Sequence, residues 1–228
     1  VKLNANGNIA WQHCYGGSND ELPYYGIIQT ADGGYAAIGS SYSNNGDANG
    51  NHGGYDVLVL KLSATGIVQW NKTYGGSQDD FGDLIVQNTD GTYTISADTY
   101  SSNGNINGNH GALDTWVARL NTNGTIIWKR CLGGSDEEYS ASLIATSDGN
   151  ILVGDYAGSH DGDVTGNHGV IQNGGDMWLV KLNRSSGNIM WTKTLGGSNG
   201  NTRSDYPDDE VALFLYETST GEFLVAGG

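Results

Sequence analysis

The sequence is poor in basic residues and has no long apolar segment. It contains 10 Lys and Arg against 25 Asp and Glu, which gives a formal net charge of −15. Because this charge repels phosphate groups, it argues against nucleic acid and anionic lipid as partners and favours cations. No stretch approaches the run of about 20 apolar residues that a membrane-spanning helix needs. With 228 residues the chain can bury a core, and we expect one soluble domain without a membrane span.

Cysteine is also scarce. Only Cys14 and Cys131 occur, each three residues after a Trp and at corresponding places in repeats that are not adjacent. Such places should lie farther apart than the roughly 7 Å between Cα atoms that a disulfide tolerates. We therefore expect two small buried thiols and no disulfide.

The sequence patterns of several enzyme classes are missing as well. No nucleotide-binding loop, no Ser-His-Asp arrangement and no Cys-His pair can be assembled from the sequence. The repeated Gly-Gly-Ser segments do not open a helix that could hold a phosphate group. Helices are hard to place anywhere, because 37 glycines interrupt every periodic stretch.

What the sequence does contain is a repeat of four short apolar runs. Asp56 to Leu62 is a first run, and the second run follows the Thr65-Gly66 turn and climbs to a Trp. Leu84 to Gln87 is a third run, and the fourth follows the Asp90-Gly91 turn. X-Gly pairs between apolar runs are hairpin signals. The repeat is marked by Trp11, Trp70, Trp128 and Trp191, and by Gly16, Gly75, Gly133 and Gly196 five positions after each of them.

Four short strands per repeat unit are typical of a β-propeller blade. We predict an all-β chain, a β-propeller of four-stranded meander blades that forms a single repeat domain over residues 1–228. Its units span approximately 1–55, 56–114, 115–176 and 177–228. Neighbouring residues such as Val57 and Leu58 are both apolar, as expected for a sheet packed between two others. The chain starts in a first run and stops in a fourth, so we expect a closed four-bladed ring or a fragment of a larger propeller, excised from a longer precursor.

The long loop between the fourth and first runs carries the clearest chemical signal. Oxygen-bearing side chains stand at its first, third and fifth places, Gly at the sixth and a carboxylate at the twelfth, a spacing that resembles an EF-hand calcium loop. A hard cation takes six to eight oxygens, and alternating residues can turn them inward. The candidate calcium ligands are Asn45, Asp47, Asn49 and Asp56 in the first loop, Asn103, Asn105, Asn107 and Asp114 in the second, and Asp161, Asp163, Thr165 and Asp176 in the third.

Two features leave an alternative open for these loops. The closing residue is Asp and not the longer Glu of an EF-hand, and an insertion in the third loop displaces Asp176. The alternative is a metal-free loop in which Asn and Asp cap their own backbone. If calcium binds, the charge count ranks the third loop above the first and the first above the second. His52, His110 and His168 stand in the repeated Gly-Asn-His-Gly, where we expect each to lock its loop through a hydrogen bond and not to bind zinc.

Acidic residues follow Gly-Gly-Ser in three units, as in Asn19-Asp20-Glu21. A basic residue recurs on the first run at Lys2, Lys61, Arg119 and Lys181. The two recurrences predict a structural ion pair in each unit. Paired carboxylates also serve glycosidases, so an active site built from these residues, or from Asp208-Asp209-Glu210, is the competing interpretation.

Tyrosines gather near the expected loops. Their rings could stack on sugars or fill a protein interface, although core packing is expected for at least half of them. They are Tyr15, Tyr24, Tyr25, Tyr42, Tyr55, Tyr74, Tyr100, Tyr139 and Tyr156.

The repeat resembles a known group of repeats. Gly7-Asn-Ile-Ala-Trp11, Gly16-Gly-Ser18, Asp32-Gly-Gly-Tyr35 and Ser43-Asn-Asn-Gly-Asp47 are similar to repeats of secreted and surface proteins of Bacteroidetes bacteria, many of which end in a type IX secretion sorting domain. The resemblance covers nearly the whole chain and departs from the pattern at residues 199–210. It implies a β-propeller-like module, an extracellular or cell-surface location and no established activity.

Together these observations predict a secreted, calcium-stabilised propeller that acts as a binding, adhesion or scaffold module without catalytic activity. Its partners would be a protein or glycan ligand and the neighbouring repeats or domains of a longer parent chain. A carbohydrate-active hydrolase or lyase that uses loop carboxylates is one alternative, and a purely structural spacer is another.

Overall fold

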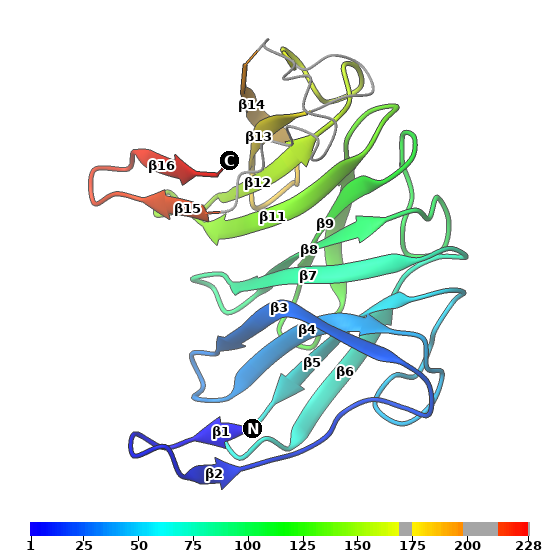
Figure 1. Ribbon diagram of the computed structural model, residues 1–228. Coiled ribbons are helices and arrows are strands. Elements are labelled where there is room, and N and C mark those ends of the chain that lie inside the picture. The colour runs from blue at the N-terminus through cyan, green and yellow to red at the C-terminus, as the bar shows by residue number, and fades with distance from the viewer. Residues whose placement is uncertain (169–174, 198–213, 228) are drawn as a thin grey trace.

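In the computed structural model, which describes residues 1–168, 175–197 and 214–227, every regular element of the described part is a β-strand (Figure 1). In chain order the strands are β1 (Lys2–Leu3), β2 (Ile9–Trp11), β3 (Glu21–Gln29), β4 (Tyr35–Ser41), β5 (Asp56–Leu62), β6 (Val68–Tyr74), β7 (Asp80–Gln87), β8 (Tyr93–Thr99), β9 (Asp114–Leu120), β10 (Ile126–Leu132), β11 (Glu138–Ala145), β12 (Ile151–Ala157), β13 (Asp176–Leu182), β14 (Ile189–Leu195), β15 (Phe214–Glu217) and β16 (Phe223–Ala226).

The strands form three complete four-stranded sheets, β3 to β6, β7 to β10 and β11 to β14, and two half-sheets, β1–β2 and β15–β16. Each complete sheet is an antiparallel meander, because strands that follow one another in the chain are neighbours. A sheet joins the third and fourth runs of one sequence unit to the first and second runs of the next. The predicted unit boundaries therefore fall inside the sheets, between β4 and β5 in the first of them.

The three sheets stack face against face in the manner of propeller blades (Figure 1). The first strand of each sheet contacts the first strand of the next, from β3 to β7, from β7 to β11 and from β11 to β15. This arrangement confirms the predicted all-β propeller fold. The half-sheets β1–β2 and β15–β16 lie at opposite ends of the stack, so the strands do not close the ring that was one of the two expected alternatives.

The inner strands β5, β8, β9, β12 and β13 are buried on both faces, as predicted. Val57 and Val59 pack into the core between the first and second complete sheets, together with Trp116 of β9. Leu58 and Leu60 of the same strand point the other way, into a cluster that includes Tyr15. The alternation of side chains along a strand thus supplies two separate interfaces.

The repeated Trp and turn Gly belong to one contact between neighbouring sheets. The indole Nε1 atoms of Trp11, Trp70 and Trp128 donate to backbone carbonyls in the next sheet's hairpin turn, those of Ala64 (3.1 Å), Thr122 (3.0 Å) and Arg184 (2.6 Å). A Cβ atom on the turn glycine would lie 2.9 Å from the Trp11 ring at Gly66, 3.0 Å from Trp70 at Gly124 and 2.7 Å from Trp128 at Gly187. Only glycine fits there, because the ring lies against the turn backbone.

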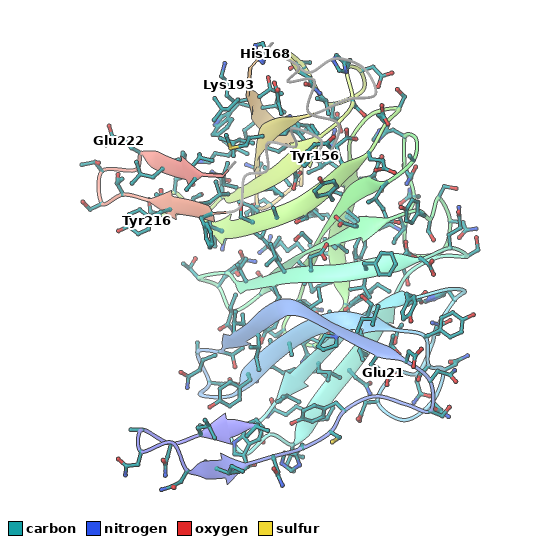
Figure 2. The ribbon with its side chains drawn as sticks, viewed as in Figure 1. Glu21, Tyr156, His168, Lys193, Tyr216 and Glu222 are labelled. Carbon is teal, nitrogen blue, oxygen red and sulfur yellow. The ribbon has the colours of Figure 1, made fainter. Side chains whose placement is uncertain are left out.

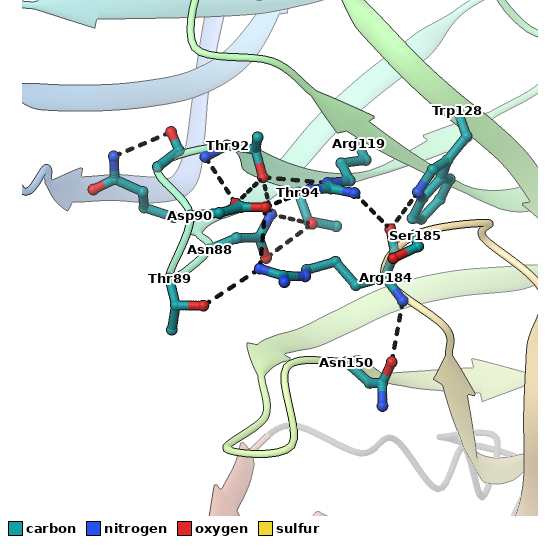
Figure 3. Close-up of polar contacts among 12 residues, drawn as sticks. Asn88, Thr89, Asp90, Thr92, Thr94, Arg119, Trp128, Asn150, Arg184 and Ser185 are labelled. Atoms are coloured by element: carbon teal, nitrogen blue, oxygen red, sulfur yellow. Dashed lines mark hydrogen bonds and ion pairs between the residues drawn. The ribbon is translucent and has the colours of Figure 1, made fainter.

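Charged groups reinforce this contact between the second and third complete sheets (Figure 3). Asp90 accepts from Arg119 at 2.6 Å and lies 3.2 Å from Arg184 Nη1. The Arg184 carbonyl accepts from both Arg119 Nη1 (3.1 Å) and Trp128 Nε1 (2.6 Å). The network ties the β7–β8 turn and strands β9 and β10 of the second sheet to the β13–β14 turn of the third.

The ion pairs expected of the basic residues form with other partners than predicted. Lys61, Arg119 and Lys181 pair with Asp32 (2.8 Å), Asp90 (2.6 Å) and Asp148 (2.6 Å) of the Asp-Gly turns, and not with the acidic residues after Gly-Gly-Ser. The reason is register: β4 pairs with β5 so that Ala36 lies opposite Lys61, which brings Lys61 to the end of the sheet that carries Asp32. The hydrogen bond from Lys61 holds the pKa of Asp32 well below its usual range.

The two cysteines are unpaired, as expected, but only one of them is buried. Cys131 lies in the core, whereas Cys14 is exposed on the segment that follows β2. Burial raises the pKa of the Cys131 thiol to about 12. The expectation of two buried thiols is wrong for Cys14, because the half-sheet β1–β2 leaves this segment uncovered.

Candidate functional site at the loop end of the sheets

The three long loops and the Gly-Gly-Ser turns lie together at one end of the sheets, which we call the loop end. Each loop follows the second strand of a complete sheet and packs on the turn that enters the same sheet. The backbone N–H groups of Asp47, Asn105 and Asp163 donate to the carbonyls of Gly16, Gly75 and Gly133, each at 2.9 Å. The loop and the turn are therefore held at a fixed distance in all three copies.

The predicted ligands at the first place of each loop bind the neighbouring turn. Asn45, Asn103 and Asp161 accept the backbone N–H groups of Ser18 (2.9 Å), Ser77 (2.8 Å) and Ser135 (2.7 Å) through Oδ1. At the third place, Asp47 accepts from Gly16 N at 3.2 Å and Asn105 from Gly75 N at 3.3 Å. Asp163 instead pairs with Arg130 at 3.1 Å.

The side chains at the fifth and closing places have different partners again. Asn49 donates to its own loop at Gly46 O (3.2 Å), and Thr165 Oγ1 lies 3.5 Å from Thr192 Oγ1. At Asn107 the backbone carbonyl accepts the Cys131 thiol at 3.5 Å. The closing carboxylates bind histidines of their own loops. The side chains of one loop are thus distributed over several partners.

This geometry bears on how calcium would bind. Many of the predicted ligand oxygens already accept N–H groups, as in a hydrogen-bonded Asx loop, and a cation would have to replace these donors. Among residues 1–168, 175–197 and 214–227, no group of three or more His, Cys, Asp or Glu side chains is placed to hold a metal ion. The loops as arranged do not fit a preformed site, and calcium binding stays a prediction.

The repeated histidines lock their loops, as predicted. Nδ1 of His52 lies 2.6 Å from Asp56 Oδ2, and the pairs His110–Asp114 and His168–Asp176 each have 2.7 Å between the same atoms. The carboxylate also accepts the backbone N–H of its histidine, at 3.0 Å in the first loop. Burial raises the pKa of Asp56, and the hydrogen bonds from His52 oppose that shift.

The acidic residue that begins the first strand of each sheet closes the Gly-Gly-Ser turn before it. Asp80 and Glu138 are fully buried and accept the N–H groups of Gly76 and Gly134, both at 2.8 Å. Glu21 accepts from Gly17 N at 3.0 Å in the same way. Burial raises the pKa of Glu138 to about 7, although it also accepts hydrogen bonds from Ser159. These carboxylates hold turns in place and do not face solvent as a pair.

A buried group of carboxyls was not anticipated from the sequence. Asp83 is 7% exposed and Asp155 is fully buried, and both interact electrostatically with Asp98, which accepts Ser140 N at 2.8 Å. Burial raises the pKa of Asp98 to about 7, and burial together with the neighbouring carboxyls holds the pKa of Asp83 well above its usual range. The available signal was the presence of Asp98 and Asp155 inside fourth runs that are otherwise buried.

The tyrosines divide between core and surface. Tyr15 and Tyr74 donate their hydroxyls to the carbonyls of Gly66 and Gly124, and so belong to the contact between sheets. Tyr42 is 51% exposed and Tyr100 is 38% exposed at the loop end. The side chains of Tyr24 and Tyr25 lie outside the described residues, as does the acidic cluster Asp208 to Glu210.

No protein-family model and no curated protein matches this chain. Among solved structures, it is similar to BamB from Moraxella catarrhalis, with 15% identity, a TM-score of 0.49 and coverage of 97% of this chain and 50% of that one. An apocarotenoid oxygenase from Synechocystis has 13% identity and a TM-score of 0.42 over 76% of this chain and 38% of that chain. A protein of unknown function from Bacteroides caccae has 14% identity and a TM-score of 0.32, over 87% and 75%.

The chain thus spans about half of the BamB chain. These likenesses are distant, and the class of protein is defined by the chain's own sheets, as a repeat protein of the β-propeller type. The part of the chain described here contains no helix long and apolar enough to cross a membrane.

Proposed function

We propose that this chain is a non-catalytic binding or scaffold module of an extracellular or cell-surface protein. The observation that supports the proposal best is that the repeated carboxylates bind the backbone of the fold itself. Asp80 and Glu138 are fully buried and accept backbone N–H groups of the turns before them. A general acid or base must reach its substrate. Carboxylates that are buried and bound to the backbone stabilise the fold and are not placed for catalysis.

The alternative of a carbohydrate-active hydrolase or lyase has weaker support. Asp83 and Asp155 have the raised pKa that an acid catalyst needs, but they are buried between strands, where a polysaccharide could not reach them. The alternative of a plain spacer does not account for the exposed rings of Tyr42 and Tyr100 at the loop end. Exposed aromatic side chains are common in binding surfaces, which favours a ligand.

The extracellular location is proposed from the resemblance to Bacteroidetes surface repeats. Calcium stabilisation is proposed from the spacing of Asn and Asp in the three long loops, where a cation would compete with the observed hydrogen bonds. Neighbouring repeats or domains of a longer parent chain would be further partners, together with a protein or glycan ligand.

The proposal is tested by measuring binding of the labelled chain to immobilised neutral polysaccharides, mucin, collagen and fibronectin, with and without calcium. We expect saturable binding to at least one of these surfaces. A chain that saturates none of them would support the spacer instead.

A further inference from the structure

A polar cavity of about 460 Å³ opens at the loop end between the first and second complete sheets. Tyr42 follows β4 and Tyr100 follows β8, so each of the two sheets contributes one of the tyrosines that line it. Gln78 and Asp79, in the turn that leads into β7, lie in the same cavity. It therefore combines exposed aromatic rings with side chains that form hydrogen bonds.

The first loop and the turn before β7 approach each other closely along this cavity. A Cβ atom on Gly53 would lie 2.6 Å from Ser77 O, and one on Gly54 would lie 2.1 Å from Asp79 Oδ1. Tyr55 N donates to Asp79 Oδ1 at 2.9 Å, and Tyr100 N donates to Asp79 O at 3.1 Å. The first long loop and the second Gly-Gly-Ser turn are thus fixed together before any ligand binds, which lowers the entropy cost of binding.

Several polar atoms that line the cavity remain available to bind a ligand. Gln78 donates Nε2 to Tyr100 O at 2.9 Å, and its own Oε1 has no hydrogen bond among the described residues. The same holds for Asp79 Oδ2 and for the hydroxyls of Tyr42 and Tyr100. The Tyr42 ring is supported by the edge of Tyr55, with 5.4 Å between ring centroids. The cavity can thus offer a ring face together with acceptors and hydroxyl donors.

We propose that this cavity, which we call the tyrosine pocket, binds one or two sugar units of a neutral glycan. The C–H face of a sugar packs on a tyrosine ring, and its hydroxyls need both acceptors and donors. Uronic acids and sulfated sugars are disfavoured by Asp79 and by the net charge of −15. The inference deepens the proposed binding function and rests on it.

The chain contains its own comparison position. The third complete sheet has Gly158 where the first and second have Tyr42 and Tyr100, and its turn carries Glu137 where the second has Asp79. The pair of tyrosines therefore occurs at one junction among the three complete sheets. Glu137 supplies a carboxylate for a matched control variant.

The test is native electrophoresis in gels that contain galactomannan, xyloglucan, polygalacturonate or no polysaccharide. We expect at least one neutral polysaccharide to slow the chain. Tyr42→Ala, Tyr100→Ala and Asp79→Asn should weaken that binding by roughly ten-fold or more, because a few central residues dominate such sites. Tyr216→Ala, an exposed tyrosine on β15 (Figure 2), and Glu137→Gln should bind like the unaltered chain.

Asp79→Asn keeps an oxygen that can accept from Tyr55 N, so it tests the pocket even if an alanine variant fails to fold. Binding that persists in all three pocket variants would overturn the pocket while leaving the proposed binding function intact. No retardation by either neutral polysaccharide, or stronger retardation by polygalacturonate, would overturn the neutral-glycan ligand. Binding to mucin, collagen or fibronectin would then decide the proposed function separately.

Discussion

Two groups of carboxyls in this protein lie in opposite chemical environments. Asp32 lies at a turn beside Lys61, whose hydrogen bond lowers its pKa. Asp83, Asp98 and Asp155 lie between strands, where burial raises theirs. The two groups act on stability in opposite directions, because the first favours the folded chain when ionised and the second when protonated.

Asp98→Asn tests the buried group. The pKa of Asp98 rises from 3.8 to about 7 on folding, so its contribution is fully present below pH 3.8 and is lost as pH rises through 7. Asparagine is neutral at every pH and can still accept from Ser140 N. We therefore expect the variant to gain a few degrees in thermal midpoint at pH 8 relative to the unaltered chain, and little at pH 4.

The exposed carboxylate Asp20, in the first Gly-Gly-Ser turn, provides the control. Asp20→Asn should shift the midpoint similarly at both pH values. A gain for Asp98→Asn that is equal at pH 4 and pH 8 would show that Asp98 is not protonated in the folded chain.

Trp128→Phe tests a single hydrogen bond between sheets. The change keeps most of the ring but removes the Nε1 donor that lies 2.6 Å from Arg184 O. We expect a loss of about 1–2 kcal/mol in the free energy of unfolding, measured by urea titration. Trp191→Phe is the matched control, since Trp191 is 37% exposed and should cost little. Equal losses in both variants would show that the hydrogen bond from Trp128 to Arg184 does not contribute to stability.

At the scale of the elements, the hairpin turns differ in whether a neighbouring sheet covers them. Gly91 and Gly124 have φ values of +81° and +83°, so alanine strains both backbones equally. A Cβ on Gly91 would meet only Thr122 Cγ2 at 3.8 Å, whereas one on Gly124 would lie 2.7 Å from Lys72 Cγ and 3.0 Å from the Trp70 ring. The hairpin turn at Gly124 is thus part of the interface between two sheets, whereas the turn at Gly91 is not.

The pair Gly91→Ala and Gly124→Ala separates these two costs. We expect Gly91→Ala to cost about 1–2 kcal/mol from the backbone alone. Gly124→Ala should cost roughly 1–3 kcal/mol more, because the sheets must move apart. Chemical denaturation of both variants measures the difference, and equal costs would contradict the close contact of Trp70 with the turn.

The long loops test the calcium proposal. If the third loop binds calcium, excess calcium over chelator should raise the thermal midpoint, since a ligand at 100 times its dissociation constant adds about 2.7 kcal/mol. Asp161→Ala should remove that rise, and Asn103→Ala in the weakly charged second loop should not. A midpoint that calcium leaves unchanged would mean that these loops are held by their hydrogen bonds alone.

The strands and the loop locks could be predicted from the sequence because their signals are local. Apolar runs and X-Gly turns locate β5 and β6, and the repeated His52 lies four residues before Asp56, which it binds. The partner of Lys61 could not be predicted, because it depends on the register of β4 against β5. The hydrogen bonds of Asn45 could not be predicted either, since alternating Asn and Asp residues occur both in calcium loops and in Asx turns.

At the scale of the whole molecule, each complete sheet contacts mainly the sheets before and after it, as in other repeat proteins. Its stability then derives largely from the contacts between sheets, to which Trp128 and Gly124 belong. Substitutions in the tyrosine pocket lie at the loop end, away from these cores. We therefore expect them to change binding more than they change unfolding.

We propose that the loop end binds a ligand and does not catalyse a reaction on it. The most direct measurement incubates the chain with galactomannan, xyloglucan and polygalacturonate, and follows reducing ends and the absorbance of unsaturated products over time. We expect no product above that of buffer, even where the polysaccharide binds. Products that accumulate in proportion to time and to the concentration of the chain, and that Asp83→Asn or Glu138→Gln abolishes, would show instead that the protein is a catalyst.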